Sequence, residues 1–164
     1  MTDFPALLQR FCDAVERADF AGFAALFADD AVYHDYIYGP FRGHQAIAHM
    51  LEKHFWGTAR AYRWQMLDPV FDGRTGYARY LFSFTSTLEW YRGRRVLLEG
   101  TSIFRIDPDG RITEYRETAN GLAAMSQLGV DPERMASRGR KWAEELRARP
   151  EAAMHLDPAM PNRA

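Results

Sequence analysis

Residues 100–119, GTSIFRIDPDGRITEYRETA, contain two strand-forming runs around a turn signal, Asp107-Pro108-Asp109-Gly110. In such a turn, proline fixes one backbone angle and glycine adopts the left-handed conformation that other residues avoid. Strands joined by so short a connection pair in antiparallel fashion. The segment therefore predicts an antiparallel hairpin near the end of a sheet.

The same pattern extends upstream to about Tyr62, where turn signals at Asp72-Gly73 and Arg92-Gly93 divide the chain into long runs. We therefore expect four antiparallel strands over residues 62–119. One run alternates large apolar with small hydroxyl side chains, as in a strand with one dry face. The apolar members of this run are Tyr80, Phe82, Phe84 and Leu88.

Helical spacing dominates the first third of the chain. Apolar residues three and four apart predict a helix over residues 4–18, a short second helix over 20–27 and a third over 43–56. A strand is expected between the second and third helices, because residues 32–37 are rich in β-branched and aromatic side chains. The order of these elements predicts an α+β fold.

Beyond the strands we expect a short helix after Gly121 and a longer one from Pro132 to about Arg147, capped by Asp131. The proline- and alanine-rich residues 148–164 are expected to be a loosely ordered tail or to lie across a partner subunit. No internal repeat or linker is visible. The predicted organisation is one domain, residues 1–147, followed by the tail.

Composition excludes several classes of function. The formal net charge is -1, and the arginines of residues 134–149 are mixed with glutamates, so we expect no nucleic-acid binding. Apolar runs are too short to cross a bilayer, and we expect no membrane association. One cysteine, Cys12, excludes an internal disulfide framework, and the opening MTDFPALLQRF does not resemble a signal peptide. We expect a cytoplasmic protein.

The order of elements and two stretches, residues 9–35 (QRFCDAVERADFAGFAALFADDAVYHD) and 100–117 (GTSIFRIDPDGRITEYRE), resemble the nuclear transport factor 2-like superfamily. This superfamily includes ketosteroid isomerases and SnoaL-like polyketide cyclases. The resemblance implies a cone-shaped curved antiparallel sheet with three N-terminal-half helices enclosing a pocket, a cystatin-like α+β roll, plus C-terminal helices. It also implies a homodimer formed through the outer sheet face. For the chemistry itself we expect no cofactor.

Three positions of the isomerase site transfer by this resemblance. The general base falls on Asp35, which keeps a carboxylate, whereas the two oxyanion-binding donors fall on Phe11 and Ser102. Phenylalanine cannot donate a hydrogen bond. Losing one such donor costs about 2.7–4 kcal/mol of transition-state stabilisation, so these substitutions argue against ketosteroid isomerisation by the known route.

A second candidate acid is Glu117, in the stretch Tyr115-Arg116-Glu117, which resembles the carboxylate position of limonene-epoxide hydrolase. The remaining partners of that enzyme fall near Ser83 and Thr85, so its water-activating network is incomplete here. Glu117 is expected to face inward toward Asp35, and two neighbouring acids would raise one pKa. The alternative for each acid is a structural role, in a turn cap or an arginine ion pair. The side chains expected to bind ligand are Phe11, Tyr33, Phe55, Trp64, Phe82, Phe84, Ser102, Phe104 and Tyr115.

The histidines do not predict a metal site. His44, His49 and His54 are five residues apart on one helix, a spacing that does not place them on one face, and His34 lies on a strand. His49 or His54 reaching the pocket mouth as a proton shuttle is the alternative to a solvent-facing histidine. Cys12 follows Phe11 on an apolar face and is assigned to core packing.

The leading hypothesis is an enzyme of the isomerase, dehydratase or cyclase (lyase) kind, acting on a small hydrophobic molecule with Asp35 as base and with Glu117, Tyr115 and Ser102 assisting. The alternatives are a non-catalytic module that binds a hydrophobic ligand in the same pocket, and a dimerisation domain without an open pocket.

Overall fold

The computed structural model describes residues 2–157, which form two compact units, one up to Leu128 and one from Gly129 onward. The first unit holds the sheet and the predicted pocket. The division between the units falls earlier than the expected boundary after residue 147. No helix within residues 2–157 has the length and apolar character needed to cross a membrane.

Two helices precede the first strand and one follows it, as predicted. Helix α1 (Phe4–Glu16) begins at Asp3, whose Oδ1 accepts a hydrogen bond from the Ala6 N–H at 3.0 Å. Helix α2 (Phe20–Ala24) is capped in the same way by Asp19. Helix α3 (Gly43–Met50) continues into a π-helical turn, η1 (Leu51–Trp56). Wider π turns are common at functional sites, because they change the direction of the following side chains.

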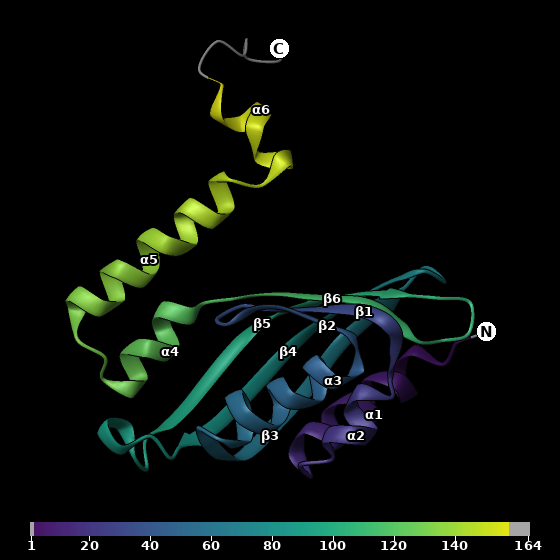
Figure 1. Cartoon of the computed structure of the whole chain (residues 1–164), viewed down its shortest axis with the longest axis horizontal. Helices are drawn as coiled ribbons and strands as arrows, with labels where there is room; N and C mark the ends of the chain where they lie inside the picture. The colour runs from purple at the N-terminus through teal and green to yellow at the C-terminus, as the bar shows by residue number, and fades with distance from the viewer. Residues whose placement is uncertain (1, 158–164) are drawn as a thin grey trace. The chain divides into compact units, whose positions relative to one another are not determined.

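The sheet has six strands in the order β2-β1-β6-β5-β4-β3, and it curves over α1, α2 and α3 (Figure 1). Its strands are β1 (Phe27–Asp35), β2 (Gly39–Arg42), β3 (Ala59–Phe71), β4 (Thr75–Ser86), β5 (Arg95–Ile106) and β6 (Ile112–Ala119). Strands β3 to β6 pair consecutively in antiparallel fashion, which confirms the prediction of four such strands.

Two features of the sheet were not predicted. Strand β1 pairs with β6 in parallel, with Tyr33 opposite Tyr115, and the short β2 folds back on β1 where the sequence indicated only a turn. In addition, β4 ends at Ser86, so Leu88 does not belong to its dry face and is exposed.

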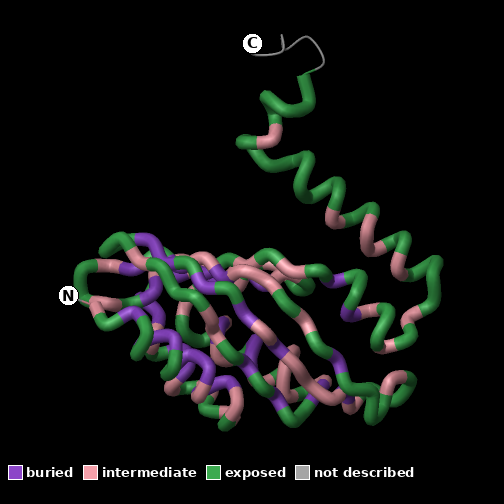
Figure 2. Tube along the Cα trace, turned by 180° about the vertical axis from the view of Figure 1, so that it is seen from behind, coloured by how far each residue is buried: buried purple, intermediate pink, exposed green. Residues whose placement is uncertain are grey.

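Buried residues concentrate between the concave face of the sheet and the helices (Figure 2). Phe11 is fully buried at the centre of this core, and its ring packs within 4.8–6.3 Å of five other aromatic rings. These rings belong to Phe23, Phe27, Trp64, Phe104 and Tyr115. Phe11 therefore acts as a packing residue of the core.

Helix α4 (Gly121–Leu128) completes the first unit and packs on β5. Strand β6 ends opposite Gly100, which leaves the backbone of Leu97 without a strand neighbour on that side. The side chain of Gln127 replaces the missing strand, accepting from the Leu97 N–H and donating to the Leu97 carbonyl, both at 2.9 Å. This pair of hydrogen bonds fixes α4 at the end of the sheet.

The second unit begins at Gly129 and contains α5 (Pro132–Arg147), a 3-10 turn (Pro150–Ala152) and α6 (Ala153–Leu156). Asp131 caps α5 by accepting from the Arg134 N–H at 3.0 Å, as its sequence indicated. Part of the predicted loose tail is therefore helical. Residues 158–164 of that tail lie outside the described residues.

Candidate functional site

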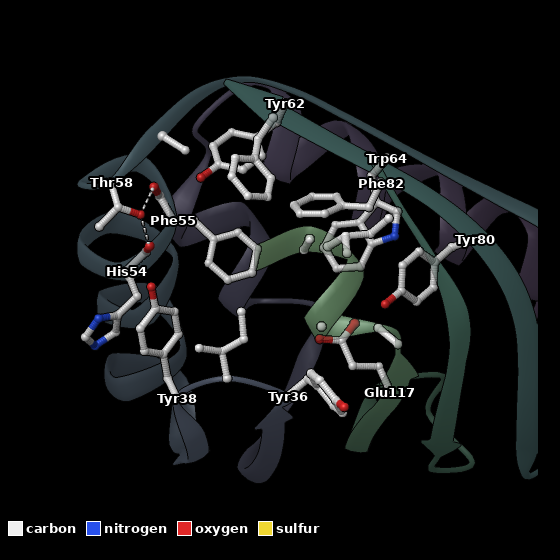
Figure 3. Close-up of a pocket in the computed structure, with 17 residues that line it drawn as sticks. Tyr36, Tyr38, His54, Phe55, Thr58, Tyr62, Trp64, Tyr80, Phe82 and Glu117 are labelled. Carbon is white, nitrogen blue, oxygen red and sulfur yellow. Dashed lines mark hydrogen bonds between the residues drawn. The ribbon is translucent and has the colours of Figure 1, made fainter. Parts of the chain in front are cut away.

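A cavity of about 100 Å³ lies between the concave face of the sheet, η1 and α4 (Figure 3). Its wall is almost entirely apolar and aromatic. The apolar and aromatic lining residues are Tyr36, Ile37, Tyr38, Phe55, Ala59, Tyr62, Trp64, Tyr80, Phe82, Phe84, Leu98, Ala119, Gly121 and Ala124. The polar lining residues are His54, Thr58 and Glu117. The cavity is thus an apolar site with few polar groups, the usual form of a small-molecule pocket.

Glu117 is the one carboxylate in this wall, and it reaches the cavity because inward-facing side chains alternate along β6 with the outward-facing Arg116. Its Oε2 accepts a hydrogen bond from the Tyr115 hydroxyl at 3.1 Å. Burial, followed by the nearby charge of Asp35, raises the pKa of Glu117 from its ordinary 4.5 to about 7. Hydrogen bonds from Tyr80, Tyr115 and the Tyr36 backbone oppose this rise. Both protonation states are therefore populated near neutral pH.

Asp35 lies beside Glu117, because the parallel register of β1 and β6 places His34 opposite Arg116 and so pairs the residues that follow them. Asp35 is buried, and burial raises its pKa. Its Oδ1 accepts hydrogen bonds from the N–H groups of Ile37 at 2.8 Å and Tyr38 at 2.7 Å. It thus caps the turn after β1 and lies behind the cavity wall, outside the set of residues that line it.

The buried hydroxyl groups of Tyr115 and Ser102 form a hydrogen-bonded chain that ends at the Glu117 carboxylate. Because the single proton of the Tyr115 hydroxyl is donated to Glu117, the Ser102 hydroxyl, 2.9 Å from that of Tyr115, is the donor in their hydrogen bond. The Tyr115 ring stacks on that of Tyr33 with centroids 4.5 Å apart. Ser102 and Tyr115 are fully buried, so their two hydroxyl groups hold the carboxylate in one orientation, whereas Tyr33 contributes its ring.

Gly100 explains how Tyr80 comes near Glu117. On the concave face, Gly100 of β5 lies between Tyr80 of β4 and Ala119 of β6. A Cβ added at Gly100 would lie 2.3 Å from the Thr118 carbonyl oxygen and 2.6 Å from the Tyr80 hydroxyl oxygen. The missing side chain therefore lets Tyr80 extend across β5 toward β6, where Figure 3 shows its hydroxyl beside the Glu117 carboxylate.

Replacing Gly100 with alanine is expected to lower the free energy of unfolding by about 1–3 kcal/mol, because the new methyl group overpacks the β5–β6 contact and displaces Tyr80. Urea denaturation measures this loss. The matched control is Gly73→Ala, in the exposed β3–β4 turn, where an added Cβ meets nothing within 4 Å and only the cost of a positive φ applies. A Gly100→Ala variant as stable as the wild type would contradict the close approach of Tyr80 and Thr118 to Gly100.

The π-helical turn shapes the end of the cavity away from Glu117. Trp56 anchors this turn to α1 by donating from Nε1 to the Val15 carbonyl at 2.9 Å. The turn directs His54 and Phe55 to the cavity, and the His54 ring stacks on Tyr38 with centroids 4.6 Å apart. Thr58 donates to the His54 carbonyl at 2.6 Å and closes the turn. His54 thus reaches the pocket, one of the two alternatives that the sequence left open.

The structure brings five of the sequence-predicted site residues into the cavity wall, namely Phe55, Trp64, Phe82, Phe84 and Glu117. The other six, Phe11, Tyr33, Asp35, Ser102, Phe104 and Tyr115, are buried behind it. Sequence reasoning missed Tyr62, Tyr80 and Tyr38 as wall residues. The alternation of β4 gave a usable signal for Tyr80, which shares its face with Phe82.

The described residues, 2–157, contain no cluster of three or more His, Cys, Asp or Glu side chains suited to a metal ion. Cys12 is buried, and burial raises the pKa of its thiol to about 12, so it is not a reactive thiolate. Among the described residues, Glu117 is the acidic and His54 the basic side chain of the cavity wall.

The curved sheet, its helices and the pocket between them define a domain of the nuclear transport factor 2-like superfamily. A family model described as SnoaL-like domain matches residues 8–115, and the chain belongs to this family. No curated protein matches the sequence.

Solved structures show the same fold. An LEH-like epoxide hydrolase from M. tuberculosis is 22% identical, with a TM-score of 0.62, over 75% of this chain and 86% of its own. A protein with a ketosteroid isomerase-like fold from Catenulispora acidiphila is 14% identical, with a TM-score of 0.69, over 80% and 96%. A protein from Xanthomonas campestris, provisionally named a polyketide cyclase, is 25% identical, with a TM-score of 0.62, over 76% and 95%.

Proposed function

We propose that this protein is a cofactor-independent enzyme that moves a proton on a small hydrophobic substrate, in a reaction of the isomerase, dehydratase or cyclase kind. One observation carries the proposal: the Glu117 carboxylate lies in the wall of an apolar cavity and has a pKa of about 7. A general base works best when its pKa is near the working pH. The family and its structural neighbours support an enzyme-type fold of this class.

In the proposed step, the Glu117 carboxylate removes a proton from a carbon next to a substrate carbonyl. The electron pair of the broken C–H bond moves into the carbonyl group and forms an enolate, and Glu117 becomes neutral. In a β,γ-unsaturated carbonyl compound, return of the proton from Glu117 to the γ carbon completes an isomerisation. In a compound with a leaving group on the β carbon, the enolate re-forms the carbonyl and a C=C bond as the bond to the leaving group breaks, and the proton on Glu117 passes to the departing group, which completes an elimination. Asp35 contributes its charge, which favours the protonated form of Glu117.

Proton exchange tests the proposal without knowledge of the natural substrate. Wild-type protein in D₂O is incubated with cyclohexanone, and ¹H NMR follows the loss of the protons next to the carbonyl. Acceleration above the buffer rate is the expected result. A wild-type protein that binds cyclohexanone but leaves the exchange rate unchanged would contradict the proposal.

A non-catalytic binding module is the second candidate, and Phe11 favours it. The position that corresponds to an oxyanion donor in the isomerases holds a side chain without any hydrogen-bonding group, packed among five rings of the core. Under this alternative, the cavity retains ligand binding while proton exchange is absent.

We also propose that the chain forms a homodimer through the convex face of β3, β4 and β5, as the superfamily resemblance implies. Leu97 and Tyr77 point outward on this face, with 54% and 45% of their surface exposed. Exposed apolar side chains grouped on one face are typical of an interface. A second copy of the chain is the commonest partner for such a face.

The Leu97→Asp variant is therefore expected to elute as an 18.9 kDa monomer, whereas the wild type elutes as a dimer. Size-exclusion chromatography with light scattering measures both masses. Trp90→Asp serves as the control, because Trp90 is 82% exposed but lies in the β4–β5 turn, away from the sheet face. A monomeric Trp90→Asp variant together with a dimeric Leu97→Asp variant would place the interface at that turn instead.

A further inference from the structure

The hydroxyl group of Tyr62 has no assigned role, although it belongs to the cavity wall. Tyr62 is only 5% exposed, and its side chain points inward from β3. Its ring stacks on Phe55 and Phe82, with centroid distances of 5.9 Å and 5.6 Å. Within residues 2–157, no side chain or backbone group is hydrogen-bonded to the Tyr62 hydroxyl. The ring is thus held in place while its polar atom is left without a protein partner.

Among the described residues, the fully buried polar atoms without a partner are the Tyr33 hydroxyl oxygen and Trp64 Nε1, so the Tyr62 oxygen, which is not one of them, can be reached from the cavity. Polar groups in a largely buried site are normally paired with protein, water or ligand. The two aromatic neighbours prevent Tyr62 from turning toward bulk solvent. A water molecule in the cavity, or an oxygen or nitrogen atom of a bound ligand, can supply a hydrogen bond to the Tyr62 hydroxyl. The Tyr62 hydroxyl is therefore held in a position where it can donate a hydrogen bond to a ligand or accept one from it.

The position of this hydroxyl relative to Glu117 defines the ligand further. Figure 3 shows the Tyr62 hydroxyl at the end of the cavity near Thr58 and His54, and the Glu117 carboxylate at the opposite end. Aromatic side chains, Phe55 and Phe82 among them, form the wall between these ends. A ligand that satisfies both ends has an apolar body with a polar group on each of two opposite sides.

The size of the cavity limits that body. An engineered apolar cavity of about 150 Å³ binds benzene. The cavity here has a smaller volume, about 100 Å³, and is open on one side, so one ring that extends into the opening is the largest body that fits unless the aromatic wall moves. The aromatic rings are closely packed, which makes such movement costly. The ring centroids of Trp64 and Phe82 are 4.6 Å apart, and those of Phe82 and Phe84 are 5.8 Å apart.

We propose that the site takes a single-ring substrate with polar groups at opposite positions, and that Tyr62 selects it by hydrogen bonding to the group remote from Glu117. The claim that the bound molecule is a substrate rests on the proposed function. The binding preference itself does not, because it holds whether or not the molecule is turned over. Tyr62 is on this basis a specificity-determining residue of the site.

Ligand-observed NMR titrations with three probes test the inference. Cyclohexanone has one polar group, 4-hydroxycyclohexanone has two at opposite ring positions, and anthrone has a carbonyl in a three-ring system. The wild type is expected to bind 4-hydroxycyclohexanone about tenfold more tightly than cyclohexanone and to leave anthrone unbound. In Tyr62→Phe, this tenfold preference is lost while the affinity for cyclohexanone is unchanged. Tyr91→Phe, in the turn between β4 and β5 and outside the cavity wall, is the matched control and keeps the preference.

Three results would overturn the inference. The first is that the wild type binds the two cyclohexanones equally, or binds neither. The second is that Tyr62→Phe weakens the binding of both probes equally, which would mean a structural role for Tyr62. The third is that anthrone binds as tightly as the single-ring probes. Failure of the proposed function gives a different result, because a protein without proton exchange would still show the Tyr62-dependent preference. The titrations therefore separate the two proposals.

Discussion

Replacing Glu117 with glutamine is expected to lower the rate of cyclohexanone proton exchange by a factor of about 10²–10⁴, the usual contribution of general acid–base catalysis. Glutamine has almost the same shape and keeps an oxygen that can accept from the Tyr115 hydroxyl. It has no carboxylate to receive a proton. The substitution thus removes the chemistry and preserves the packing, and ¹H NMR exchange rates with equal protein concentrations measure the effect.

Glu114→Gln is the matched control for this experiment. Glu114 lies on the same strand but on the convex face, where it contacts Arg116 at 2.6 Å and His34 at 3.2 Å. Its replacement is expected to leave the exchange rate within twofold of the wild type. Equal losses in the two variants would mean that the effect comes from the strand and not from the cavity.

Asp35→Asn separates the two acids. Because the Asp35 charge raises the pKa of Glu117, its removal is expected to move the pH dependence of exchange to lower pH while the rate at high pH is retained. The sequence alone favoured Asp35 as the base. Loss of exchange in Asp35→Asn, with activity retained in Glu117→Gln, would return the role of base to Asp35.

Much of the fold follows from local patterns in the sequence. The apolar spacing of residues 4–18 predicted α1, and the turn at Asp107-Pro108-Asp109-Gly110 predicted the β5–β6 hairpin. Short β2 and the parallel pairing of β1 with β6 were missed, because they depend on contacts between segments that are distant in sequence. No local periodicity encodes such contacts.

The site was predictable to a smaller extent. Strand parity placed Glu117 on the same face as Tyr115, which is what the structure shows, but parity cannot tell a cavity wall from the core beneath it. Tyr115 is fully buried, whereas Glu117, two residues further on, lines the cavity. That difference depends on where η1 and α4 cover the curved sheet, a property of the whole domain. The π-helical turn that directs His54 into the wall likewise has no signature in the spacing of its residues.

The raised pKa of Glu117 also predicts how stability depends on pH. The carboxyl titrates near 4.5 when unfolded and at about 7 in the native protein, so between these values the native state binds more protons than the unfolded state. Stability therefore falls as pH rises through this interval and is constant, as far as Glu117 is concerned, above it. Over this pH interval, the titration of Glu117 lowers the free energy of unfolding by about 3 kcal/mol.

Urea denaturation of the wild type and of Glu117→Gln at pH 5 and at pH 8 isolates this effect. Asp35, whose pKa is also raised by burial, contributes in the same direction in both proteins, so the comparison cancels its part to first order. The free energy of unfolding of the wild type is expected to fall by about 2–3 kcal/mol more than that of the variant between the two pH values. A difference between the two proteins that stays constant with pH would mean that Glu117 titrates normally, in contact with solvent, and is not a desolvated base in an apolar cavity.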